Sequence, residues 1–138
     1  MKYFFSKTAL SLFLFVAVAL SNCKKDDTPT DPNVAAKTTI VGHWDIVKLV
    51  SNGTDISSTS GGSFDFSQDD TFTAVAIDNG GTIDLAGTYS FSNSGKTLTL
   101  VSGLIGTVAY QVNKLEASDA QLQITLGLET RIADMKKK

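Results

Sequence analysis

The sequence has very few of the side chains that carry metal or nucleophilic chemistry. Its 138 residues include one cysteine, Cys23, and one histidine, His43. A lone cysteine excludes a disulfide within the chain, so hydrophobic burial must hold the fold together. Zinc sites and catalytic triads need several such residues side by side. We therefore predict that this protein is not an enzyme and has no catalytic residue, metal site or cofactor. The carboxylates fit turn-forming and solubilising roles better than acid–base roles, namely Asp65, Asp69, Asp70, Asp78 and Asp84.

An excess of basic charge and a long apolar run are also missing. Twelve lysine and arginine residues stand against fourteen aspartate and glutamate residues. A nucleic-acid binder needs a basic face, so nucleic acid is excluded as a partner. A membrane-spanning helix needs roughly 20 apolar residues, and the longest run, from Ala9 to Leu20, is shorter. Preceded by Lys2 and Lys7, that run has the pattern of a secretory signal peptide.

The end of the apolar run carries the cysteine. Leu20-Ser21-Asn22-Cys23 resembles the lipobox of bacterial lipoproteins. This resemblance implies that the signal peptide, residues 1–22, is removed and that Cys23 carries diacylglycerol and an acylated amine. Each buried methylene contributes about 0.8 kcal/mol, so several acyl chains anchor a protein firmly in a membrane. An uncleaved anchor, or a plain secretory signal with a chance cysteine, is the alternative.

The residues after Cys23 add an expected location and a spacer. Lys24-Lys25-Asp26-Asp27 resembles the export signal of bacterial surface lipoproteins, which implies an outer-membrane lipoprotein, exposed on the cell surface. A solvated spacer is the simpler interpretation of the same charges. Residues 23–38, charged and holding both prolines, are predicted to be the lipidated cysteine and a flexible tether. Removing residues 1–22 of 138 leaves 116, enough for one domain, which we place at 39–138.

The body of the chain has the texture of strands and tight turns. Short runs rich in threonine, valine, isoleucine and aromatic residues alternate with turn clusters such as Asp78-Asn79-Gly80-Gly81. Alternation of apolar and polar residues, as in Gln121–Leu126, indicates antiparallel strands with one solvated face. No run indicates a helix. Eight strands are predicted, at about 40–50, 62–67, 71–78, 82–92, 96–101, 107–115, 121–126 and 129–135.

The order of these strands resembles a known family. Gly42-His43-Trp44 is similar to the Gly-x-Trp motif that opens the first strand of lipocalins, and the runs from Phe64 to Val75 and from Leu85 to Val101 are similar to short bacterial lipocalin-like lipoproteins. The resemblance covers about residues 40–135. It implies an all-β fold, an antiparallel up-and-down meander closing into a small eight-stranded lipocalin-like barrel. It also implies that Trp44 plugs one barrel end and that Arg131, the only arginine, lies over its ring.

The predicted inward faces are rich in aromatic side chains. Eight-stranded barrels are just wide enough to be filled by side chains or to hold one small ligand. We expect a non-catalytic binding domain for a small apolar molecule, with a cavity among Phe64, Phe72, Tyr89 and Tyr110. The alternative is a solid-core interaction module, an accessory subunit or inhibitor that contacts an envelope protein or a glycan through loops such as 51–62. The residues expected to line the pocket or fill the core are Trp44, Phe64, Phe66, Phe72, Tyr89, Phe91 and Tyr110.

Overall fold

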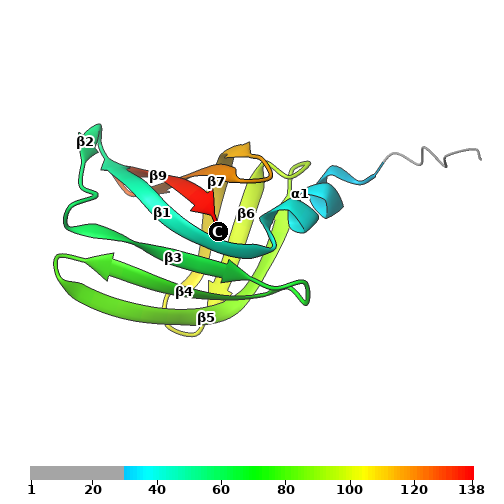
Figure 1. Cartoon of the computed structure of the whole chain (residues 1–138), viewed down its shortest axis with the longest axis horizontal. Helices are drawn as coiled ribbons and strands as arrows, with labels where there is room; N and C mark the ends of the chain where they lie inside the picture. Colours follow the sequence, from blue (N-terminus) through cyan, green and yellow to red (C-terminus); the bar gives the residue numbers. More distant parts are fainter. Residues whose placement is uncertain (1–29) are drawn as a thin grey trace, which may run out of the picture.

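The computed structural model describes residues 30–138, and it builds them around one antiparallel sheet that closes on itself (Figure 1). Each strand pairs with the next, and the last strand pairs with the first to close the barrel. The eight barrel strands are β1 (Gly42–Ser51), β3 (Ser60–Phe66), β4 (Thr71–Asp78), β5 (Gly81–Ser92), β6 (Thr97–Ser102), β7 (Gly106–Leu115), β8 (Asp119–Leu126) and β9 (Glu129–Lys137). A two-residue strand, β2 (Thr54–Asp55), folds back onto the end of β1.

The predicted architecture is confirmed: this is an all-β, eight-stranded antiparallel barrel. Every predicted strand is present, with its ends displaced by at most two residues. Local chemistry explains this accuracy. The Asn52-Gly53 and Asn79-Gly80 pairs both have positive φ at both residues, which is the conformation that tight hairpin turns require. The short strand β2, which follows the first of these turns, was not predicted.

The one helix of the described residues, α1 (Pro32–Ile40), corrects the prediction of a flexible tether up to residue 38. Asp31 caps it, because its side chain accepts a hydrogen bond from the Asn33 amide at 2.8 Å. Proline at the first helical position is compatible with a helix start. Two turns are marginal alone in water, so tertiary contacts must hold the helix. The Asn33 side chain accepts from the Gly95 amide at 2.8 Å, and Ile40 is fully buried.

The helix lies at one end of the barrel (Figure 1). We call this the closed end; it also carries the turns at 67–70, 93–96 and 116–118. The open end carries the connections at 52–59, 79–80, 103–105 and 127–128. The core lies toward the closed end, where β1, β4, β6 and β8 begin and where β3, β5 and β9 end. The largest side chains that are almost fully buried are Trp44, Phe72, Ile40, Leu98, Leu100, Leu122 and Met135.

No helix among residues 30–138 is long and apolar enough to cross a membrane. The predicted signal peptide, the lipid attachment at Cys23 and the charged cluster at 24–27 lie outside the described residues.

Candidate binding site at the open end of the barrel

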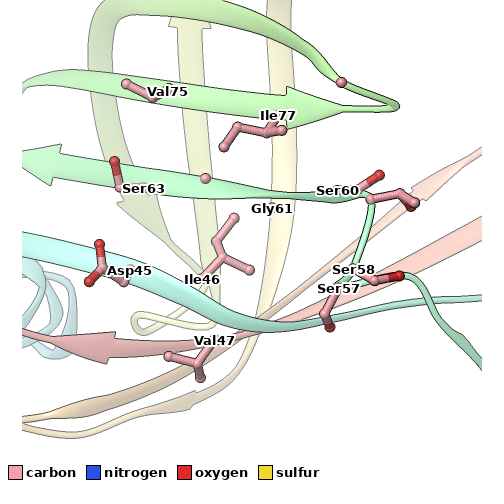
Figure 2. A pocket seen from close by; sticks show the side chains of 13 residues that line it. Asp45, Ile46, Val47, Ser57, Ser58, Ser60, Gly61, Ser63, Val75 and Ile77 are labelled. Atoms are coloured by element: carbon pink, nitrogen blue, oxygen red, sulfur yellow. The ribbon is translucent and has the colours of Figure 1, made fainter.

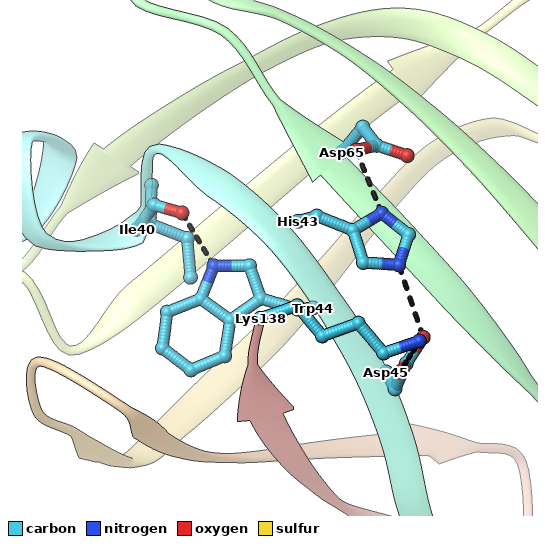
Figure 3. A network of polar contacts seen from close by, with 6 residues as sticks. All are labelled: Ile40, His43, Trp44, Asp45, Asp65 and Lys138. Carbon is cyan, nitrogen blue, oxygen red and sulfur yellow. Dashed lines mark hydrogen bonds and ion pairs between the residues drawn. The ribbon is translucent and has the colours of Figure 1, made fainter.

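Trp44 seals the closed end, but a different cation lies over its ring. The indole Nε1 donates a hydrogen bond to the Ile40 carbonyl at 2.6 Å (Figure 3). The Lys137 ammonium lies 5.2 Å from the centroid of the indole ring and donates to the Thr39 carbonyl at 2.9 Å. The predicted pairing of Trp44 with Arg131 is therefore wrong. Trp44 faces Lys137 in the β1–β9 register, while Arg131 faces Ser51 at the other end of the strand.

Arg131 belongs instead to the open end. Its Nε donates to Glu129 Oε1 at 2.7 Å, and the Ser51 hydroxyl donates to the same oxygen at 2.6 Å. These hydrogen bonds, first from Arg131 and then from Ser51, lower the pKa of the Glu129 carboxyl. The register places Arg131 beside Ile124, with which it lines the interior near the barrel mouth. The only arginine of the chain thus forms a neutral pair at the rim.

The predicted aromatic set divides between the two ends. Phe66, Phe72 and Tyr89 are at most 3 % exposed and pack together, with the Phe66 and Tyr89 rings edge to face at 5.1 Å. Together with Trp44, they fill the closed half of the barrel, so they belong to the core and line no open-end cavity. Phe91 packs edge to face on Tyr89 at 6.4 Å and is partly buried.

Phe64 and Tyr110 alone of that set line a cavity inside the open half. The cavity has a volume of about 170 Å³. An apolar cavity of roughly 150 Å³ is known to bind benzene, so this interior space has the size of one aromatic ring. Burial raises the pKa of the Tyr110 phenol, which keeps it neutral. The other residues that line the cavity are Ile46, Leu49, Gly61, Ala76, Ile77, Asp78, Leu122, Ile124, Arg131 and Ala133.

A larger hollow lies on the outer wall beside this cavity (Figure 2). It has a volume of about 870 Å³ and follows the line where β1 and β3 separate. We call it the outer groove. Five hydroxyl side chains line it, together with apolar side chains from β1 and β4. The hydroxyl residues are Ser57, Ser58, Thr59, Ser60 and Ser63, and the apolar residues are Ile46, Val47, Val75 and Ile77.

The sequence did not predict the outer groove, although the loop 51–62 was named as a possible contact surface. That segment returns along β1: the Ile56 amide donates to the Leu49 carbonyl at 2.8 Å, and Ser57 accepts from the Leu49 amide at 2.8 Å. Its serines are thereby placed at the edge of the barrel wall. The many serine and glycine residues of this segment could have indicated a polar surface site. Composition alone, however, does not show which strands the segment lies against.

His43 lies on the outer face, opposite Trp44 (Figure 3). Its Nδ1 is 2.8 Å from Asp65 Oδ1, and its Nε2 is 3.0 Å from Asp45 Oδ1. The hydrogen bond to Asp65, and then that to Asp45, raises the pKa of His43 above its ordinary 6.5. Lys138 lies 2.6 Å from the other oxygen of Asp45, and this contact is the main cause of the lowered pKa of Asp45. Both ring nitrogens are occupied by carboxylates, which is an arrangement for holding β1 and β3 together.

The acidic turn at 67–70 is also satisfied locally. Asp69 accepts from the Thr71 hydroxyl at 2.6 Å, and Asp70 lies 2.6 Å from the Lys37 ammonium of α1. Within residues 30–138 no three histidine, cysteine or acidic side chains gather as metal ligands would. The turn therefore serves to fasten the helix to the barrel.

Comparison with solved structures gives the same fold. A lipocalin-like protein from Bacteroides uniformis superposes with a TM-score of 0.55 at 17% identity, over 72% of this chain and 99% of its own. A redesigned β-barrel superposes with a TM-score of 0.50 at 17% identity, over 75% of this chain and 94% of its own. No protein-family model and no curated protein matches the sequence. At such identities the likeness extends to the fold, so what the chain shares with the Bacteroides protein is a lipocalin-like barrel.

Proposed function

We propose that this protein is a non-catalytic, membrane-anchored lipoprotein whose barrel binds a small apolar ligand in the open-end cavity. The observation that carries the proposal is the unequal filling of the barrel. Aromatic and aliphatic side chains pack the closed half, while about 170 Å³ remains free between Phe64 and Tyr110. Ligand sites in β-barrels lie preferentially at the mouth, lined by apolar groups with a few polar ones. Asp78 and Arg131 supply the polar groups here.

A titration with benzene tests this proposal, because the ring matches the cavity in size. Full-length protein in lipid nanodiscs would be followed by NMR, with empty nanodiscs as the blank. We expect saturable shifts at Phe64, Tyr110 and Ile124. Ala76→Leu, which fills the cavity from β4, should weaken binding at least tenfold. The matched control, Ala109→Leu, places the same bulk on an exposed position of β7, outside the residues that line the cavity. Shifts that do not saturate, or that survive Ala76→Leu, would contradict the proposal.

The anchoring part of the proposal rests on the lipobox-like segment and needs its own experiment. Cells fed with an alkyne analogue of palmitate should label the protein through Cys23, and the label should vanish in Cys23→Ser. The lipidated protein should fractionate with the outer membrane, and protease added to intact cells should remove it if the charged cluster at 24–27 directs it to the surface. Labelling that persists in Cys23→Ser would place the lipid elsewhere.

A second candidate function is supported by the rim of the open end. Leu104, Leu126 and Leu128 are 70%, 55% and 100% exposed, and all three belong to the ends or tips of open-end hairpins. Exposed apolar side chains gathered in one place mark interaction sites more often than isolated ones do. The rival proposal is an interaction module that contacts an envelope protein or a glycan through this rim. A photo-crosslinker at Leu128, compared with one at Lys96 of the closed end, should then capture one defined partner in the native host.

A further inference from the structure

The barrel wall is interrupted beside the cavity. Strands β1 and β3 pair from Gly42 with Phe66 to Asp45 with Ser63, and there the ladder stops. Continued pairing would place Ile46 opposite Gly62, but no such pairing forms. On the other side of β1, the register with β9 shifts between Ile46 and Lys48, and Val47 is extruded and 53% exposed. Such bulges bend a strand and end its pairing, so β1 turns away from β3 at this point.

The interruption brings the outer groove and the interior cavity together. Ile46, Gly61 and Ile77 line both hollows. Gly61 is central in this set because it has no side chain, and a Cβ added to it would meet nothing within 4 Å (Figure 2 shows its place on β3). The adjacent Gly62 differs, since its φ is +136° and a Cβ there would strike the Val75 carbonyl. Gly61 thus contributes only backbone to the wall between the groove and the cavity, and free space lies beside it for a side chain or a ligand.

The groove has a definite chemistry. Among the residues that line it are five hydroxyl side chains and one carboxylate, and none of them is lysine or arginine. The carboxylate, Asp45, is already held by Lys138 and His43. Ser58 and Ser63 have no hydrogen-bond partner for their hydroxyls within residues 30–138, whereas Ser60 donates to Asp78 at 2.7 Å. These groups suit a neutral hydrogen-bonding molecule, because no lining residue is a cation that an anion could pair with, and a cation would compete with Lys138 for Asp45.

We infer that the ligand is a neutral amphiphile that enters through the side of the barrel, with a ring-sized apolar end in the cavity and a hydroxylated head in the outer groove. The inference rests on the proposed function, since it extends the same cavity through the wall at Gly61. The volumes agree with this division: about 170 Å³ inside suits one ring, and about 870 Å³ outside is ample for a sugar-sized head. The chemical class is that of an aryl or short alkyl glycoside.

Three probes carry the same benzene ring and differ in their head group: benzene, benzoate and phenyl β-glucoside. Comparing them separates binding in the cavity from binding in the outer groove. Each is titrated into full-length protein in lipid nanodiscs, and the affinity is read from NMR shifts. Phenyl β-glucoside should bind about tenfold more tightly than benzene, because two or more hydrogen bonds to the groove add modest net free energy. Benzoate should bind no more tightly than benzene. Shifts for the glucoside alone should extend to Ser58 and Ser63.

Two variants then locate the opening. Gly61→Val should lower the affinity for the glucoside at least fivefold, while the control, Gly103→Val, should not change it. Gly103 is matched because a Cβ there also meets nothing within 4 Å. Should Gly61→Val fail to fold, Ser58→Ala with Ser63→Ala removes the unpaired hydroxyls without changing the backbone. This double variant should weaken only the glucoside, by about fivefold.

The outcomes separate the two proposals. If benzene binds in the cavity but the glucoside gains nothing, or if neither groove variant affects it, the lateral site is overturned and the proposed function stands. If benzoate binds as tightly as phenyl β-glucoside, the groove does not select a neutral head, and that part of the inference is overturned. If no probe binds, the cavity is not a ligand site and both proposals fall together.

Discussion

The two ends of this barrel are built from the same strands and yet differ in almost every physical respect. At the closed end, Trp44 is fully buried, its indole nitrogen is paired with Ile40, and α1 covers the opening. At the open end, Leu128 is fully exposed, a cavity lies between the strands, and the β1–β3 ladder stops. The difference teaches that stability can be concentrated in one half of a small barrel, which leaves the other half free to keep space for a ligand.

The largest expected effect is the loss of Trp44. Trp44→Ala should lower the free energy of unfolding by about 3–5 kcal/mol, because truncation leaves a cavity in the best-packed part of the molecule. Leu128→Ala, an apolar truncation at the open end, should change it by less than about 0.5 kcal/mol. Urea unfolding of both variants gives the comparison. Similar losses in the two variants would show that stability is spread evenly between the ends.

The cation over Trp44 gives the next largest effect. A double-mutant cycle of Trp44→Phe with Lys137→Met should yield a coupling free energy of about 0.5–2 kcal/mol, the range for a cation above an aromatic ring. The same cycle with Arg131→Met should yield no coupling, because Arg131 faces Ser51, seven positions along β1 from Trp44, and pairs with Glu129. Coupling to Arg131 instead of Lys137 would restore the original expectation for the closed end.

Helix α1 is the part of the closed end that sequence reasoning did not foresee, and its cap gives a smaller effect. Asp31→Ala should lower the free energy of unfolding by about 1 kcal/mol, because the Asn33 amide loses its acceptor. Asp84→Ala is a matched control, since Asp84 is exposed on β5 and has no hydrogen-bond partner within residues 30–138. The two variants would be compared by urea unfolding. If Asp31→Ala leaves the free energy of unfolding unchanged, α1 contributes little to closing the barrel.

These cases show why the sequence predicted some features and missed others. Alternation and Asn-Gly turns are local, so the strands and their order could be read from short windows of sequence. The partner of Trp44 depends on the register between the first and last strands, which nothing local determines, and the prediction therefore chose the wrong cation. The Asp31-Pro32 pair fits a helix start, but the short helix is held by groups outside it, among them Gly95, which is 62 residues from Asn33 in the sequence.

The candidate site was predicted in the same uneven way. Phe64 and Tyr110 were assigned to a pocket, and they do line the cavity, because inward-facing residues follow from period-two alternation. Phe72 and Tyr89 were assigned to the same pocket, but they pack in the core, since alternation gives the face of a residue and not its height in the barrel. The outer groove could not be predicted, because it exists only where two strands stop pairing.

The smallest expected effect concerns His43, which fastens β1 to β3 just before their ladder ends. Its pKa is raised in the folded state by Asp65 and Asp45, so folding stabilises the protonated ring. This contribution is complete below the unfolded pKa of about 6.5 and is lost as the pH rises through the higher folded value. Stability should therefore fall from about pH 6.5 upward in the native protein and fall less in His43→Asn. Urea midpoints measured at half-unit steps from pH 5.5 to 8.5 give the comparison. Identical slopes would mean that the Asp45–His43–Asp65 contacts do not hold the two strands together.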